Sequence, residues 1–199
     1  MKYVPNALTI TRILVTPLLL VLLLSNTPAG YTWALGLFVF ASISDYLDGK
    51  LARRYKVGTN LGQYLDPFAD KILVLGTFIA LIFVLPDLVP VWAVVLIAVR
   101  DVAVTVLRSW AKMSGRTLRT MRMAKLKTTV QLTFLILTLL LLALSTIPGK
   151  FGRSISEFLH GDILFWMLVL VVVVTVATGV VYFTRVKDLI EVKVDPNEY

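Results

Sequence analysis

Six apolar runs without a charged residue alternate with polar segments along the sequence. A helix needs about 20 residues to cross the hydrocarbon core of a bilayer. Several of the runs are shorter than that, but each forms the apolar part of one span, so the pattern predicts six transmembrane helices. The runs cover residues 13–26, 31–44, 72–86, 88–99, 128–148 and 163–184.

The second, third and fourth runs are shorter than a full span. Their helices must therefore include flanking polar residues, such as Asp45, Lys71 and Arg100. Charged groups within a bilayer almost always face the bundle interior or a water-filled cavity. We therefore expect these three side chains to point away from lipid.

The two ends of the chain differ from the apolar runs. Residues 1–12 predict a short amphipathic helix at the membrane interface, and the tail from about residue 186 to 199 is polar. Arg12 interrupts the approach to the first run and no small-residue cleavage site follows, so this run is expected to be a retained span and not a signal peptide. The expected fold is all-α, a single polytopic membrane domain over residues 1–199.

Composition supports this interpretation. Hydrophobic types make up 58% of the 199 residues and charged types 16%, too apolar for an ordinary soluble domain. The net charge of +8 gathers in the second and fourth loops, which places these loops and both termini in the cytoplasm, with the protein in the inner cell membrane. This topology explains the charge without a nucleic-acid partner. The basic residues of these two loops are Lys50, Arg53, Arg54, Lys56, Arg108, Lys112, Arg116, Arg119, Arg122, Lys125 and Lys127.

Four aspartates stand at the facing ends of the second and third predicted helices. Asp45 and Asp48 are three residues apart, and Asp66 and Asp70 are four apart, so each pair projects from one face of its helix. A short connection makes the two helix ends antiparallel neighbours. The four carboxylates are therefore expected within one small volume.

Such a cluster needs compensating charge, because two carboxylates about 4 Å apart repel by roughly 4 kcal/mol at an effective dielectric of 20. An all-oxygen ligand set, in a chain without cysteine and with one distant histidine, favours Mg²⁺ or Mn²⁺ over Zn²⁺. Four carboxylates can bridge two such ions, as in two-metal phosphoryl transfer. The alternative, ion pairing with Arg53 or Lys71, does not account for two pairs in helical register.

The residues between the pairs suit a phosphate-bearing substrate. Gly49 permits close approach to the backbone, Ala52 leaves space on the same face, and Arg53 offers a fork of donors for phosphate oxygens. Gly62 lies four residues before Asp66, in register with that face.

Taken together, residues 45–70 carry the pattern D-x-x-D-G-x-x-A-R-x8-G-x-x-x-D-x-x-x-D. This pattern resembles the signature of the CDP-alcohol phosphatidyltransferases at every position. The resemblance implies a six-helix membrane fold, usually homodimeric, with two divalent ions per active site. It further implies that Asp70 is the general base and that the CDP part of a lipid donor is contacted by Gly49, Ala52, Arg53 and Thr59. The metal ligands implied are Asp45, Asp48, Asp66 and Asp70.

Three further segments resemble the bacterial members of this family that make phosphatidylglycerophosphate. The opening "PNALTITR" matches P-N-x-L-T-x-x-R, in which Asn6, Thr9 and Arg12 would line the donor site. An ordinary capped helix start explains the same residues as well. "VRD" at 99–101 also matches, and "AKLKTTVQ" at 124–131 resembles G-K-x-K-T-x-x-Q, with Ala124 in place of glycine.

Basic residues after the fourth run favour an anionic acceptor. Arg116, Arg119 and Arg122 recur every three residues, so a helix would align them in a stripe. Such a stripe can bind the phosphate of glycerol 3-phosphate, or it can hold anionic lipid headgroups, at roughly 1 kcal/mol per base. The predicted acceptor-phosphate residues are Arg100, Arg116, Arg119, Lys125 and Lys127.

The predicted reaction transfers the phosphatidyl group of CDP-diacylglycerol to glycerol 3-phosphate and releases CMP. The same chemistry with inositol phosphate, phosphatidylglycerol or serine as acceptor is an alternative. A divalent-cation channel or carrier that uses the four carboxylates as its filter is a second alternative. It leaves Gly49, Ala52 and Arg53 without a function.

Overall fold

The structure of the protein, a computed structural model, describes residues 4–55, 60–113, 117–118, 122–184 and 190–191. Within the helices, side chains are described over residues 13–44, 71–107, 109–110 and 126–184. The described chain forms helices and one pair of two-residue strands, so the prediction of an all-α fold is confirmed in outline. The helices are α1 (Val4–Leu24), α2 (Pro28–Tyr55), α3 (Asn60–Val84), α4 (Val91–Met113), α5 (Arg122–Ser145), α6 (Lys150–Leu159) and α7 (Asp162–Thr184).

Each of the six apolar runs lies mainly in one of the six long helices. Each helix also includes polar residues beyond its apolar run, and for this reason the helices are longer than the runs. Two helices of the described chain are long and apolar enough to cross a membrane, at Leu126–Ser145 and Asp162–Thr184. Shorter apolar stretches occur at Ile13–Leu24, Pro28–Ser44 and Lys71–Val84. Helices capable of crossing a membrane are therefore present in the described chain, while a total of six spans stays a prediction.

Large apolar side chains point outward around the bundle. In a water-soluble protein contiguous apolar surface of this kind is rare, and a helix that is hydrophobic on all sides is typical of a membrane span. This exterior suits lipid. The most exposed examples lie between 59% and 70% exposed and include Leu14, Trp33, Phe83, Val106, Trp166 and Leu170.

Two parts of the chain differ from the sequence prediction. A separate N-terminal amphipathic helix is not formed, because residues 4–24 make one continuous helix, α1. Pro5 does not break it, since a proline in the first helical turn removes only an N–H that has no partner there. The connection before α7, which lies between two apolar runs and was not predicted to form a helix, contains helix α6.

Helix α6 is short and two-sided. It follows Gly149, whose φ of 109° lies in the left-handed region that glycine reaches without strain. Leu159 is buried, whereas Lys150, Arg153 and Glu157 are exposed. The charged face prevents an apolar run, and the apolar-run pattern therefore did not predict this helix.

The packing centres on α1 and α5. Helix α1 contacts both α2 and α3, α5 contacts α2, α6 and α7, and α4 contacts α7. Phe78 and Phe134 stack with ring centroids 6.1 Å apart and link α3 to α5. Both rings are fully buried, and aromatic stacking of this kind typically adds about 0.5–1.5 kcal/mol beyond the burial of apolar area.

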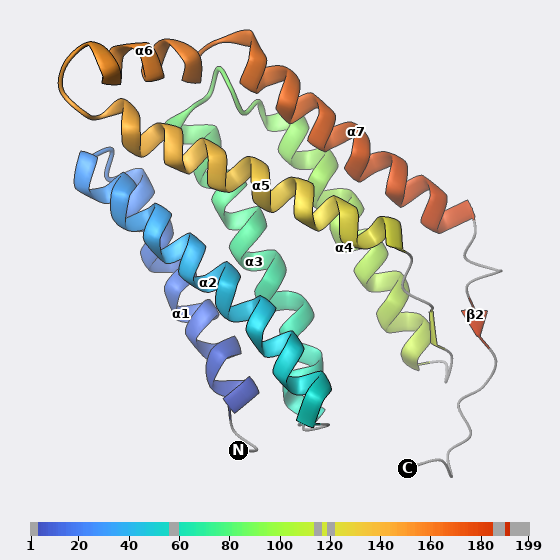
Figure 1. Cartoon of the computed structure of the whole chain (residues 1–199). Helices are drawn as coiled ribbons and strands as arrows, with labels where there is room; N and C mark the ends of the chain where they lie inside the picture. Colours follow the sequence, from blue (N-terminus) through green and yellow to red (C-terminus); the bar gives the residue numbers. More distant parts are fainter. Residues whose placement is uncertain (1–3, 56–59, 114–116, 119–121, 185–189, 192–199) are drawn as a thin grey trace.

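The ends of the long helices lie on two sides of the bundle (Figure 1). The start of α1, the end of α2, the start of α3 and the end of α4 lie on one side. The turns from α1 to α2 and from α3 to α4 lie on the other side, together with α6. The side on which α1 begins is thus also the side of the lysine- and arginine-rich ends of α2 and α4.

The turn between α1 and α2 leaves no space for a side chain at Gly30. A Cβ atom there would lie 2.4 Å from the Ser25 Oγ atom and 2.5 Å from the Leu22 carbonyl oxygen. The Gly30 N–H also donates to the Thr27 Oγ1 atom at 3.0 Å. Overpacking of this kind typically costs about 1–3 kcal/mol, so we expect Gly30→Ala to lower the thermal unfolding midpoint in detergent, followed by tryptophan fluorescence.

Gly36 provides the matched control for Gly30. It lies on the same helix, is exposed, and has no atom within 4 Å of a built Cβ. We expect Gly36→Ala to be neutral or slightly stabilising, because alanine is the better helix former. Equal midpoints for Gly30→Ala and Gly36→Ala would contradict the tight turn.

Candidate functional site

Both aspartate pairs lie on helices, as the spacing predicts. Asp45 and Asp48 belong to α2, and Asp66 and Asp70 belong to α3. Residues 56–59 alone separate these two helices, and the two helix ends lie on the same side of the bundle (Figure 1). The backbone therefore brings the two pairs to one end of the molecule.

The side chains of the four aspartates lie outside the described residues. The same holds for the side chains of Asn6, Thr9 and Arg12 on α1, of Ala52 and Arg53 on α2, and of Lys125 on α5. Gly49 and Gly62 lie in the corresponding parts of α2 and α3, and Thr59, Arg116 and Arg119 lie outside the described residues altogether. The start of α1, the end of α2 and the start of α3 nevertheless meet on one side (Figure 1).

The arrangement of backbone fits a metal centre at this end. Where side chains are described, no three residues of the types His, Cys, Asp and Glu lie together. The prediction of a metal site therefore rests on the two aspartate pairs of α2 and α3. Two pairs at three- and four-residue spacing, on helices that end side by side, supply the all-oxygen donor set that Mg²⁺ or Mn²⁺ prefers. The two-ion site stays a prediction.

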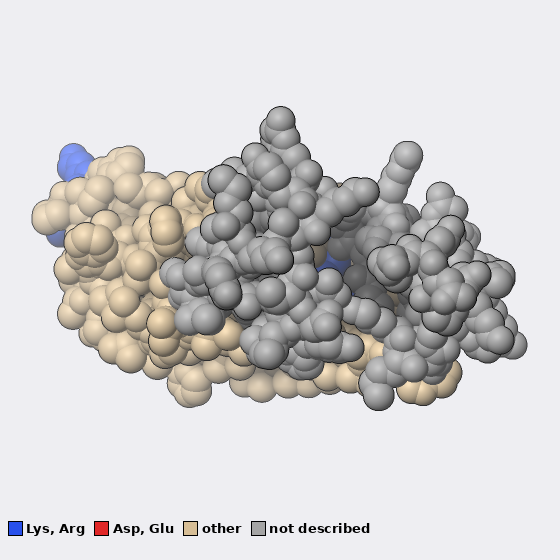
Figure 2. Space-filling view, turned by 90° about the horizontal axis from the view of Figure 1, so that it is seen from below, with Lys and Arg blue, Asp and Glu red and all other residues tan. Residues whose placement is uncertain are grey.

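Figure 2 looks at this end of the bundle from below. Much of the face belongs to parts that are not described, and blue from a Lys or Arg side chain is visible between them. No described Asp or Glu side chain is visible on this face. The described charge seen from this side is positive.

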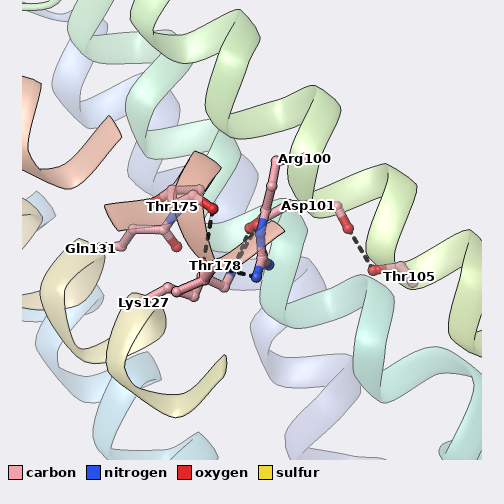
Figure 3. Close-up of polar contacts among 7 residues, drawn as sticks. All are labelled: Arg100, Asp101, Thr105, Lys127, Gln131, Thr175 and Thr178. Atoms are coloured by element: carbon pink, nitrogen blue, oxygen red, sulfur yellow. Dashed lines mark hydrogen bonds and ion pairs between the residues drawn. The ribbon is translucent and has the colours of Figure 1, made fainter. Parts of the chain in front are cut away.

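Polar side chains from three helices meet inside the bundle, and we call this group the α4–α5–α7 cluster (Figure 3). Most of its side chains are almost fully buried: Asp101 is 3% exposed and Arg100 is 9% exposed. Arg100 therefore faces the interior, as the cost of charge in lipid predicts. The cluster comprises Arg100, Asp101 and Thr105 of α4, Lys127 and Gln131 of α5, and Thr175 and Thr178 of α7.

Asp101 accepts hydrogen bonds from two cations. The Lys127 Nζ atom donates to both carboxylate oxygens of Asp101 at 2.5 Å. The Arg100 Nη1 atom donates to the Asp101 Oδ1 atom at 3.2 Å. Asp101 is thus the counter-charge of both Arg100 and Lys127, and its ion pair with Lys127 joins α4 to α5.

The other terminal nitrogen of Arg100 binds α7. The Arg100 Nη2 atom donates to the Thr178 Oγ1 atom at 3.1 Å, and the Thr178 hydroxyl donates in turn to the Thr175 carbonyl oxygen at 2.9 Å. The Gln131 Nε2 atom donates to the Thr175 Oγ1 atom at 3.2 Å. Hydrogen bonds therefore connect all three helices.

The cluster carries a formal surplus of one positive charge, from two cations and one carboxylate. The buried Arg100 Nε atom also has no hydrogen-bond partner among the described residues. Buried charge without a counter-charge is costly, and guanidinium groups bind phosphate oxygens well. An anionic ligand is the chemistry that this arrangement best accommodates.

Of the five predicted acceptor-phosphate residues, the structure brings Arg100 and Lys127 together. Lys71, which was also expected to face away from lipid, is half-buried and lines an open groove of about 680 Å³ between α3 and α4. The strand Thr117–Leu118 (β1), between Arg116 and Arg119, pairs antiparallel with Ile190–Glu191 (β2). The predicted helical stripe is thus interrupted by a strand.

The sequence prediction missed the contribution of α7. Thr175, Thr178 and Gly179 are polar or small residues within a largely apolar helix. Thr175 is fully buried, and a Cβ atom at Gly179 would lie 2.7 Å from the Arg100 Cγ atom. Their three- and four-residue spacing, which places them on one helix face, was the available signal.

An apolar exterior, buried charges between helices and acidic helix ends on one side define an integral membrane protein with a polar site at one end. The sequence profile of the CDP-alcohol phosphatidyltransferase family matches residues 2–177. The chain therefore belongs to the CDP-alcohol phosphatidyltransferases, membrane enzymes of phospholipid biosynthesis.

Similar proteins agree with this assignment. The chain is 34% identical, over 94% of its length and 98% of the relative, to a CDP-diacylglycerol–glycerol-3-phosphate 3-phosphatidyltransferase of Rickettsia typhi. It is 31% identical to the Bacillus subtilis enzyme of the same name, over 91% of this chain and 93% of the relative. The crystal structure of Mycobacterium tuberculosis phosphatidylinositol phosphate synthase, in apo form, shares the fold with a TM-score of 0.55 and 22% identity, over 89% of each chain.

Proposed function

We propose that the protein transfers the phosphatidyl group of CDP-diacylglycerol to glycerol 3-phosphate, which gives phosphatidylglycerophosphate and CMP. The observation that carries this proposal is the similarity, over more than nine-tenths of both chains, to two enzymes named for that reaction. The surplus positive charge of the α4–α5–α7 cluster supports an acceptor that bears a phosphate.

Asp70 acts as the general base in this proposal. It takes the proton from the acceptor hydroxyl, whose oxygen forms a bond to the phosphorus of the phosphatidyl group. The bond from that phosphorus to the CMP oxygen breaks, and CMP leaves with the electron pair. Two Mg²⁺ or Mn²⁺ ions, held by Asp45, Asp48, Asp66 and Asp70, would neutralise charge on the phosphates when bound.

The donor site follows from the family signature. The CDP part of the donor contacts residues at the end of α2 and the start of α3, and the start of α1 completes the site. Support comes from the backbone, which gathers these three helix ends on one side (Figure 1). The proposed donor residues are Asn6, Thr9, Arg12, Gly49, Ala52, Arg53, Thr59 and Gly62.

The acceptor phosphate binds to basic side chains from α4, α5 and the connection between them. Arg100 and Lys127 form the buried part of this site, where the surplus charge lies. Arg116, Arg119 and Lys125 form the outer part. Glycerol 3-phosphate then places its hydroxyl toward Asp70 while its phosphate is held by these bases.

The proposed topology has six spans, with both termini and the active site on the cytoplasmic side of the inner membrane. A single domain covers residues 1–199, and the active protein is a homodimer. This arrangement leaves the donor's acyl chains in lipid while its nucleotide and the water-soluble acceptor enter from the cytoplasm. Support comes from the ends of α2 and α4, which carry many of the basic residues and lie on one side of the bundle (Figure 1).

An acceptor assay tests the proposal. Purified protein in mixed micelles receives labelled CDP-diacylglycerol, Mg²⁺ and, in separate reactions, glycerol 3-phosphate, inositol phosphate, phosphatidylglycerol or serine. We expect CMP release with glycerol 3-phosphate and formation of a lipid that carries an additional phosphate.

Two results would contradict it. CMP release with another acceptor but not with glycerol 3-phosphate would reassign the substrate. Divalent-metal flux through the protein in liposomes free of CDP-lipid, without transferase activity, would favour a channel or carrier.

A further inference from the structure

Gly179 of α7 leaves room for the side chain of Arg100. A Cβ atom at position 179 would lie 2.7 Å from the Arg100 Cγ atom and 3.3 Å from its Nε atom. The closest atom is near the base of the arginine side chain and cannot swing away as a side-chain tip can. A larger residue at 179 would therefore displace Arg100 or push α7 away from α4.

Thr178 fixes the far end of the same side chain. Its hydroxyl proton is committed to the Thr175 carbonyl oxygen at 2.9 Å, so the oxygen presents a lone pair to the Arg100 Nη2 atom at 3.1 Å. Backbone-directed bonding of this kind is ordinary for a threonine within a helix. Thr178 thus acts as an oriented acceptor.

The guanidinium group is held from two sides. The Nη1 atom bonds Asp101 on its own helix, and the Nη2 atom bonds Thr178 across the helix interface. Because the group is planar, two anchored nitrogens fix its plane. The Nε atom is buried and lacks a hydrogen-bond partner within the described chain.

We propose that Thr178 and Gly179 are positioning residues for the acceptor: they hold the Arg100 guanidinium where it binds the acceptor's phosphate. They act through Arg100 and do not touch the substrate. The proposal rests on the proposed function, from which it takes Arg100 as a phosphate ligand. Both residues lie beyond residues 2–177, the part that matches the family profile.

The proposal predicts a specific kinetic change. Thr178→Val keeps the size and branching of the side chain but removes the acceptor, whereas Thr178→Ser keeps the hydroxyl. Losing a hydrogen bond to a charged group corresponds to about a tenfold change in binding. We expect Thr178→Val and Gly179→Ala to raise the KM for glycerol 3-phosphate about tenfold, with kcat and the KM for CDP-diacylglycerol within about twofold of wild type.

Controls separate positioning from general damage to the fold. Thr178→Ser should restore the wild-type KM, and Gly36→Ala, at an exposed α2 position with open space around it, should leave both KM values unchanged. Thermal unfolding of each variant is measured in the same detergent. If Gly179→Ala does not fold, Thr178→Val and Thr178→Ser decide the question.

Failure of this inference is distinguishable from failure of the proposed function. If the wild type uses glycerol 3-phosphate and folded Thr178→Val has an unchanged KM for it, the positioning role is wrong and the function stands. An equal rise in both KM values would overturn the role as well. If the wild type uses another phosphate-bearing alcohol, the same KM comparison is made with that alcohol. Use of an acceptor without a phosphate would overturn both the proposed function and the positioning role.

Discussion

Replacing Asp70 with asparagine is expected to lower CMP release by at least two orders of magnitude. An amide cannot take the proton from the acceptor hydroxyl, and general-base catalysis typically contributes about 10²–10⁴-fold. Asp48→Asn is expected to have an effect of similar size through the metal site, because it removes a charged oxygen ligand. Initial rates of CMP release at saturating substrates measure both.

The fold should survive these substitutions. Removing one of four clustered carboxylates relieves repulsion when no metal is bound, so unfolding in the presence of EDTA should occur at the wild-type temperature or higher. Asp87→Asn is the matched control, because Asp87 is exposed in the turn between α3 and α4, on the opposite side of the bundle. Near-normal turnover in Asp70→Asn would rule out its role as the base.

Asp101→Asn is expected to cause the largest loss of stability. Asp101 is 3% exposed and is the carboxylate shared by Arg100 and Lys127, so its neutralisation leaves two cations buried together. Breaking a buried ion pair from one side typically costs about 3–5 kcal/mol. Equilibrium unfolding in mixed micelles measures the loss, with Glu157→Gln, at an exposed position on α6, as the control.

A second substitution tests the mechanism. Lys127→Met removes one of the two cations and keeps an unbranched side chain, so Asp101→Asn combined with Lys127→Met should be more stable than the two separate losses predict. Additive losses in the double variant would show that the ion pair does not carry the stability. An Asp101→Asn protein as stable as wild type would contradict the buried cluster itself.

The positions of the long helices follow from sequence because lipid imposes a simple rule. Backbone groups in a bilayer must bond within their own helix, so each apolar run predicts a helix, and α1 to α5 and α7 match the six runs. The same reasoning placed Arg100 toward the interior, since a charge exposed to lipid is costly. The spacing of the aspartates, three and four residues apart, predicted that the candidate metal site lies at the end of α2 and the start of α3.

The apolar pattern predicted helices less well where polar and apolar residues alternate within one helix. Helix α6 combines a buried Leu159 with an exposed charged face, and α1 continues through residues that are polar enough to suggest a separate segment. Helix α6 follows a glycine at φ 109°, and α1 tolerates a proline in its first turn, so the apolar pattern marks the start of neither helix.

Only the tertiary structure decided which residues meet inside the bundle. Lys127 reaches Asp101 across 26 positions, and Thr178 reaches Arg100 across 78. Helix α7 is apolar on nearly every face, so its apolar pattern does not mark the buried side, and the spacing of Thr175, Thr178 and Gly179 is the sequence signal that remains. The rotation of α7, and with it the contact of Gly179 with Arg100, is set by how closely the helices pack, a property that no apolar pattern encodes.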